Sequence, residues 1–174
     1  FPFSNTEIKI VIGSTFGDEG KGNVVQWLCK QALNEGKRVV VCRYSGGPQA
    51  AHTVCYNGVE HICSTYGAGV LLGVPTYLIN SVLIDPISAR KERQILYSKG
   101  INSPKIYSNP YNRLFITPYD VYYNQHDIQT ILDGTCGKGI NATCERLMGG
   151  MFVDGAEANL NISYKYYKTF KHVD

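Results

Sequence analysis

The chain has 174 residues, 44% of them hydrophobic, and its 17 basic and 14 acidic residues give a formal net charge of +3. This length and apolar content predict one domain with a hydrophobic core, spanning residues 1–174. The weak, scattered charge argues against nucleic-acid binding, and the absence of an apolar run of about 20 residues argues against a membrane partner. Because residues 1–7 also lack a signal-peptide pattern, we expect a cytoplasmic protein.

Short apolar runs alternate with helical patterns along the chain, which predicts an α/β fold with a mainly parallel sheet flanked by helices. The apolar face of residues 23–33 predicts a first helix that packs on the core and ends before Gly36. Asp85-Pro86 and Thr117-Pro118 predict the starts of two later helices, which end near residues 100 and 132. The expected strands are residues 8–13, 38–43, 77–80, 105–107 and 114–116.

A β-hairpin is predicted near residues 53–62. Its turn is Asn57-Gly58, because these two residues tolerate the positive φ angles that a two-residue turn requires. In this register His52 lies opposite Cys63.

A glycine-rich loop, residues 17–22 with the sequence GDEGKG, follows the first predicted strand and precedes the first helix. Amide groups beside glycines, the helix dipole and the ammonium group of Lys21 all favour anionic oxygens, and an adjacent carboxylate can hold a metal ion. The spacing differs from Walker A, since six residues separate Gly13 from Gly20-Lys21. The sequence therefore predicts a P-loop-like phosphate site.

Six cysteines, at positions 29, 42, 55, 63, 136 and 144, include no C-x-x-C pair. They lie mostly in apolar segments, which predicts buried thiols rather than disulfides or a zinc site. The other histidines, His61, His126 and His172, show no metal-binding spacing and are interpreted as surface or hairpin residues.

Two further motifs make the interpretation more specific. With GDEGKG as the first motif, the second motif is RYSGGPQAAHTV at residues 43–54, and the third motif is GTCGKGI at residues 134–140. Together with GDEGKG they resemble, in order, signatures of the adenylosuccinate synthetase family. The resemblance covers about residues 8–150, corresponds to the N-terminal half or less of family members and is closest to the short archaeal and viral branch. Residues 151–174 form an unassigned tail rich in Tyr and Lys.

The resemblance implies a ligase that uses GTP and Mg²⁺ to join L-aspartate to IMP through a 6-phosphoryl intermediate, in a homodimer. It implies catalytic roles for Asp18, Lys21 and His52, with Asp18 as general base. Asp18 and the carbonyl of Ala51 are the implied magnesium ligands. The implied GTP-binding residues are Gly17, Asp18, Glu19, Gly20, Lys21, Gly22, Ala51, His52 and Thr53. The implied IMP-binding residues are Asp18, Glu19, Gly20, Lys21, Gln49, Ala50, Ala51, His52, Thr135 and Cys136.

Some positions depart from the family pattern. Ala51 stands where the family has glycine, Gln49 replaces asparagine, and Cys136 replaces a threonine, which is a better hydrogen-bond donor. The arginine expected after the third motif has no counterpart, and Arg146 matches a different position. These departures leave open one alternative, a catalytically silent protein that binds purine nucleotides or a partner. A second alternative, within the synthetase interpretation, is a viral variant that acts on dGMP.

Overall fold

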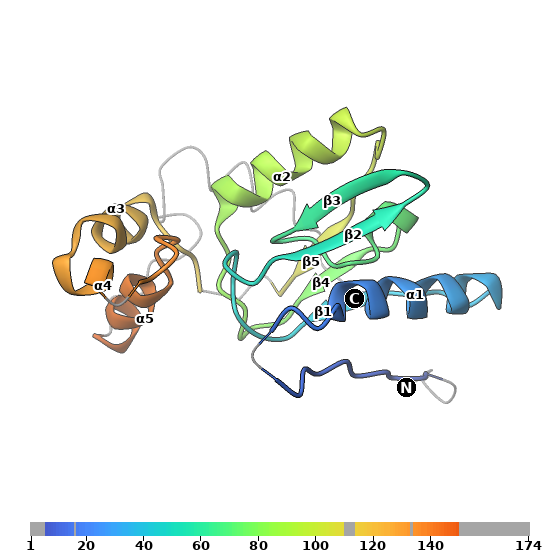
Figure 1. Ribbon diagram of the computed structural model, residues 1–174, viewed down its shortest axis with the longest axis horizontal. Helices are drawn as coiled ribbons and strands as arrows, with labels where there is room; N and C mark the ends of the chain where they lie inside the picture. The colour runs from blue at the N-terminus through green and yellow to red at the C-terminus, as the bar shows by residue number, and fades with distance from the viewer. Residues whose placement is uncertain (1–5, 16, 110–113, 133, 150–174) are drawn as a thin grey trace.

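The computed structural model describes residues 6–15, 17–109, 114–132 and 134–149. A three-stranded parallel sheet lies at its centre, with strands β1 (Val41–Arg43), β4 (Thr76–Leu78) and β5 (Ile106–Ser108) in the order β1-β4-β5 (Figure 1). The predicted α/β class and parallel sheet are therefore confirmed. The predicted tail at residues 151–174 lies outside the described residues.

Two long helices accompany the sheet. In the view of Figure 1 the strands lie between α1 (Lys21–Asn34) and α2 (Pro86–Ser98). The 3₁₀ turn η1 (Val70–Leu72) contacts α1. Both of them also contact the strand β2 (His52–Tyr56). The core is formed by buried apolar residues from the sheet, the hairpin, α2 and the connecting loops, including Val54, Tyr66, Leu78, Ile84 and Leu96.

The predicted hairpin is confirmed. Strands β2 (His52–Tyr56) and β3 (Val59–Cys63) pair antiparallel, with His52 opposite Cys63. The turn residues Asn57 and Gly58 have φ angles of 49° and 77°. The two residues therefore adopt the positive φ angles on which the prediction depended.

The predicted helix caps are also present. The carboxylate of Asp85 accepts hydrogen bonds from the amides of Ile87 and Ser88 at 2.9 and 3.2 Å. Thr117 and Asp120 form a reciprocal capping box at the start of α3 (Pro118–His126). The single helix predicted to reach residue 132 is wrong, because Asp127 is extended (ψ 122°) and separates α3 from α4 (Ile128–Leu132). α5 (Ile140–Met148) packs against α3, and the three helices gather at one end of the molecule (Figure 1).

The strand predicted at residues 8–13 does not form. Ile8, Ile10 and Ile12 are 72–80% exposed, and the segment pairs with no strand of the described residues. Alternating isoleucines favour an extended backbone, but a strand also requires a neighbour that accepts its hydrogen bonds and covers its apolar face. The glycine-rich loop of residues 17–22 therefore follows an exposed segment rather than a sheet strand.

Other predicted boundaries also change. Residues 38–40 precede β1 without pairing, and residues 114–116 contribute only one parallel bridge, Phe115 to Ile84. On α1, Cys29 is buried as expected, but Val24 and Leu33 are 44% and 39% exposed. The apolar stripe of α1 is therefore wider than the surface that the described residues provide to cover it.

Candidate functional site

The glycine-rich loop of residues 17–22 leads into the N-terminus of α1. Its backbone is left-handed at Asp18 (φ 54°) and at Gly20 (φ 74°), the residue immediately before the helix. Within the described residues no side chain caps this helix, and its first turn contains no acidic residue. Uncapped amides at the positive end of a helix dipole attract anionic oxygens. This geometry suits a phosphate group.

Lys21, the cation of this loop, already has a partner. Its ammonium group forms an ion pair with Glu19, whose other carboxylate oxygen accepts hydrogen bonds from the amide and hydroxyl of Thr15 at 2.6 and 2.7 Å. The hydrogen bond from Lys21, followed by those from Thr15, lowers the pKa of Glu19 to about 2. A phosphate group that binds Lys21 must therefore compete with a fully ionised carboxylate.

The first and second motifs meet at Gly22 and His52. A Cβ atom added to Gly22 would lie 2.8 Å from Cβ of His52 and 3.4 Å from the carbonyl oxygen of Thr53. Any residue other than glycine would thus push α1 away from β2. The absence of a side chain at position 22 allows the start of α1 and the start of β2 to lie side by side.

His52 is half-buried beside two cationic side chains. Burial lowers the pKa of His52 below its ordinary value of 6.5, and the charges of Arg43 and Lys21 lower it further. The imidazole is therefore neutral at pH 7, with one nitrogen that donates and one that accepts a hydrogen bond. His52 can thus exchange a proton or donate to an anionic oxygen without a permanent charge.

Arg43 organises the second motif. One terminal nitrogen of its guanidinium donates to the carbonyl of Ser64, and the other donates to the carbonyls of Ala50 at 2.9 Å and Gly47 at 3.3 Å. Sequence reasoning assigned no role to Arg43. Its signal was an arginine at the end of a strand, directly before a glycine-rich loop that offers free carbonyls.

The third motif approaches the second. A Cβ atom at Gly47 would lie 2.9 Å from Cδ1 of Ile140 and 3.1 Å from Cβ of Leu83, so the loop contacts the start of α5 without room for a side chain. Gly139 precedes α5 in a left-handed conformation (φ 77°) and has no side chain with which to cap the first turn of this helix. The uncapped N-termini of α1 and α5 therefore offer two sites for anions, one in each of the flanking motifs.

Asn124 on α3 holds the third motif in place, a role that sequence reasoning missed. Its side-chain oxygen accepts a hydrogen bond from the amide of Gly139 at 2.8 Å, and its nitrogen lies 3.5 Å from the hydroxyl of Thr135. The adjacent Gln125 donates to the carbonyl of Gly137 at 3.0 Å. The loop of Thr135 and Cys136 is thus positioned by α3. The sequence predicted the start of this helix but not its contact with the third motif.

Arg146 has structural partners. Its guanidinium donates to both carboxylate oxygens of Asp120, at 2.9 and 2.8 Å, and to the carbonyl of Phe115 at 2.8 Å. These contacts join α5 to the start of α3. The guanidinium of Arg146 is thus engaged by structural contacts within this group of helices.

Several predicted site residues are exposed on these loops. Asp18 has no hydrogen-bond or ion-pair partner among the described residues, and its carboxylate and the main-chain carbonyl of Ala51 are hard oxygen donors of the kind that Mg²⁺ prefers. The residues present thus fit a magnesium ion. Gln49, Thr53 and Cys136 are exposed, whereas Ala50 and Thr135 are half-buried.

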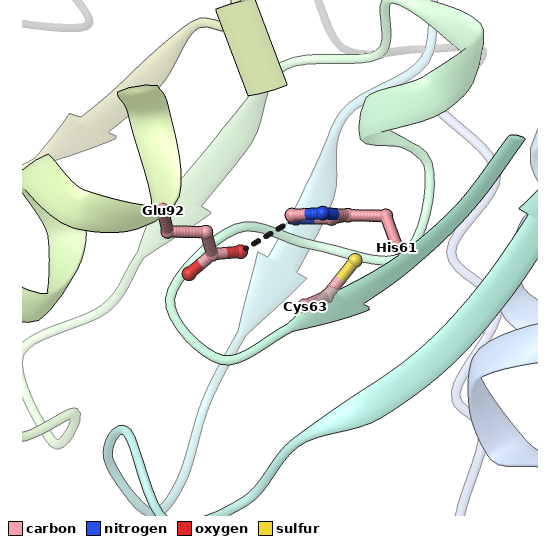
Figure 2. A group of neighbouring side chains, drawn as sticks. All are labelled: His61, Cys63 and Glu92. Carbon is pink, nitrogen blue, oxygen red and sulfur yellow. Dashed lines mark hydrogen bonds and ion pairs between the residues drawn. The ribbon is translucent and has the colours of Figure 1, made fainter. Parts of the chain in front are cut away.

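A buried polar cluster lies between the hairpin and α2 (Figure 2). One ligand atom from each of His61, Cys63 and Glu92 lies within 4.8 Å of the other two, a set of donors that zinc could use. However, Nε2 of His61 lies 3.2 Å from Oε1 of Glu92, and that carboxylate also accepts bonds from the amides of Ser64, Thr65 and Tyr66. Its lone pairs are thus occupied, and the cluster joins the hairpin to α2 as a hydrogen-bonded network.

The cysteines differ from the prediction of buried thiols. Only Cys29 and Cys63 are buried, where burial raises their pKa to about 11 and about 12, respectively. The other four are exposed and free, because the loop, the strand faces and the face of α5 that carry them reach solvent although they lie among apolar residues. Cys136, in the third motif, is one of the exposed thiols.

Three comparisons relate the chain to known proteins. The family described as Adenylosuccinate synthetase matches residues 10–151. The adenylosuccinate synthetase of Azobacteroides pseudotrichonymphae is 29% identical over 170 residues, which span 92% of this chain and 38% of the relative. That of Acetivibrio thermocellus is 31% identical over 134 residues, which span 72% of this chain and 30% of the relative.

The fold is also similar to a solved structure. The fully ligated adenylosuccinate synthetase from Plasmodium falciparum has a TM-score of 0.63 and 19% identity, over 82% of this chain and 33% of that one. The chain thus spans about a third of the length of these proteins. Within the described residues, no helix combines the length and hydropathy needed to cross a bilayer.

Proposed function

Because the chain belongs to the adenylosuccinate synthetase family, we propose that it binds purine nucleotides and takes part in the GTP- and Mg²⁺-dependent joining of L-aspartate to IMP. The observation that carries this proposal is the meeting of Lys21, Gly22 and His52 at the uncapped N-terminus of α1. A phosphate loop, a cation and a neutral imidazole are the groups that phosphoryl transfer to a base oxygen requires.

Each residue has a proposed role. Asp18 would accept the N1 proton of IMP, so that O6 attacks the γ-phosphorus of GTP and GDP leaves; the amine of aspartate then displaces the phosphate from C6. Lys21 would neutralise phosphate oxygens, and His52 would donate to the charge that develops during transfer. When bound to Asp18 and the Ala51 carbonyl, Mg²⁺ would supply charge neutralisation at the phosphates.

The remaining motif residues would bind the two nucleotides. The amides of residues 17–22 are suited to GTP phosphates, and those at the start of α5, together with Thr135, are suited to the phosphate of IMP. We extend the proposal to a homodimer in the cytoplasm and to the short archaeal and viral branch of the family. Because the chain spans about a third of its relatives, phosphate binding is the part of this function that its own residues support best.

A second candidate is a nucleotide-binding relative without catalysis. It is favoured by Ala51, whose methyl group restricts the backbone at a proposed magnesium ligand, and by Cys136, a weak donor at a proposed phosphate contact. The viral alternative that acts on dGMP is less favoured, because the catalytic aspartate tends to be replaced in the viral enzymes that use dGMP, and Asp18 is present here.

Calorimetry with GTP, IMP and Mg²⁺, singly and together, tests binding. Heat with either nucleotide supports the proposal, and the absence of both heat and a thermal shift with every purine nucleotide would contradict it. An absorbance assay for adenylosuccinate then separates a ligase from a silent relative. Asp18→Asn is the matched control, because asparagine tolerates the left-handed backbone at this position (φ 54°) better than alanine does. Activity that survives this substitution removes Asp18 from its proposed role.

A further inference from the structure

Arg43 is largely buried at the end of β1, and burial lowers its pKa. Among the described residues it forms no ion pair with a carboxylate; its terminal nitrogens donate instead to the carbonyls of Ser64, Ala50 and Gly47. A buried guanidinium that is satisfied by main-chain oxygens fixes the geometry of the chain segments that carry them, because each broken contact leaves a buried donor unpaired.

The segments that Arg43 holds lie on both sides of His52. Gly47 and Ala50 belong to the loop that enters β2 at His52, and Ser64 directly follows Cys63, the residue that pairs with His52 across the hairpin. One side chain therefore joins the entry to β2 with the exit from β3.

The contact with Ser64 continues to α2. The carbonyl of Ser64 and the amide of Thr65 belong to the same peptide group; Arg43 donates to the carbonyl, and the amide donates to Oε2 of Glu92 at 2.6 Å. The positive and negative side chains thus lie at the oxygen and hydrogen ends of one peptide dipole, which stabilises both charges away from water. Glu92 also binds the hairpin through His61, as the dashed line in Figure 2 shows.

We propose that Arg43 is a positioning residue of the candidate site, which holds the loop of residues 46–51 and the start of β2 so that His52 lies against Gly22 and Lys21. This inference rests on the proposed function for its biological meaning. Arg43 acts through the loop and through His52; it is not assigned a contact with substrate.

The contact between Gly22 and His52 makes this role measurable. A Cβ atom at Gly22 would lie 2.8 Å from Cβ of His52, so protons of these two residues should give a nuclear Overhauser effect (NOE) in NMR spectra. A lysine at position 43 keeps the charge but cannot donate to three carbonyls in the same fork geometry.

The test uses the nucleotide-free chain and the pair Arg43→Lys and Arg43→Met. For Arg43→Lys we expect amide hydrogen exchange at Ala50 and Ala51 to accelerate by about tenfold or more, and the NOE between Gly22 and His52 to weaken. For Arg43→Met we expect the same two changes, at least as large, because methionine donates no hydrogen bond. Arg38→Lys and Arg38→Met are matched controls on an exposed arginine of the same segment and should change neither quantity.

Wild-type exchange rates and a wild-type NOE between Gly22 and His52 in both Arg43 variants would overturn the proposal. Should a variant fail to fold, the unaltered protein provides a direct measurement: the terminal nitrogens of Arg43 should give separate NMR signals because the bonds to Ser64 and Ala50 prevent rotation, and free rotation would overturn the proposal equally. Since none of these measurements contains a nucleotide, a failure of the proposed function in calorimetry remains distinguishable from a failure of this inference.

Discussion

Glu19 and Lys21 form an ion pair within the glycine-rich loop of residues 17–22. The carboxylate of Glu19 therefore competes with an incoming phosphate for the ammonium group of Lys21. The carboxylate is held by Thr15 on its other oxygen, which fixes it beside the ammonium group. The charge of Lys21 is therefore already compensated before any ligand binds.

Glu19→Gln should strengthen the binding of phosphate-containing ligands. Glutamine keeps the hydrogen bond with Thr15 but removes the negative charge, so Lys21 becomes available to the ligand. Since exposed ion pairs are weak, we expect a gain of about two- to fivefold in affinity for pyrophosphate, measured by calorimetry at low salt. Lys21→Met should abolish the gain in the double variant; an unchanged affinity for Glu19→Gln would show that the ion pair does not compete.

Gly22→Ala should destabilise the fold. The added methyl group would lie 2.8 Å from Cβ of His52, and the close packing of α1 on β2 leaves it no space. We expect a loss of about 1–3 kcal/mol in the free energy of unfolding, measured by urea denaturation. Asn23→Ala, at the next and exposed position of α1, is the control and should change stability little. Equal stabilities for the two variants would contradict the packing argument.

Gln26→Met should stabilise the protein. Gln26 is 8% exposed on α1, and its side-chain nitrogen has no hydrogen-bond partner among the described residues. Methionine has a similar length and leaves no buried donor unpaired, so we expect a gain of about 1 kcal/mol in thermal or urea denaturation. A loss of stability would indicate that the amide has a partner in the intact protein.

Asp120 should make the packing of α3 against α5 sensitive to acid. Burial raises the pKa of Asp120, but the hydrogen bonds from Arg146 and Thr117 together outweigh burial, so the pKa is lowered from 3.8. A lowered pKa in the folded state gives a stabilisation that is complete above about pH 5 and is lost as the pH falls through 3.8 toward the folded value. Urea denaturation from pH 6 to pH 3 measures this decline.

Asp120→Asn should remove that part of the pH dependence and lower stability by roughly 3 kcal/mol at pH 6, because the largely buried guanidinium of Arg146 loses the opposite charge that faces it. Glu145→Gln is the control for loss of an exposed carboxylate on α5. If the two variants decline identically with pH, the ion pair does not determine the acid sensitivity.

The sequence by itself determined the local elements of this protein. Asn57-Gly58 sets the hairpin and its register, Asp85-Pro86 and Thr117-Pro118 start two helices, and the glycines before α1 leave its amides open, because each of these effects acts over only a few residues. The three motifs could likewise be recognised in the sequence, because their glycines, Lys21 and the hydroxyl of Thr135 are residue types suited to phosphate binding.

The tertiary structure alone decided which of these pieces meet. It left residues 8–13 without a partner strand among the described residues despite their alternating isoleucines, because a strand needs a partner that no local pattern supplies. It also brought Gly22 against His52, Ile140 against Gly47, and Arg43 and Glu92 to opposite ends of one peptide group. Such contacts join residues that lie far apart in the chain, and they depend on how the whole chain packs.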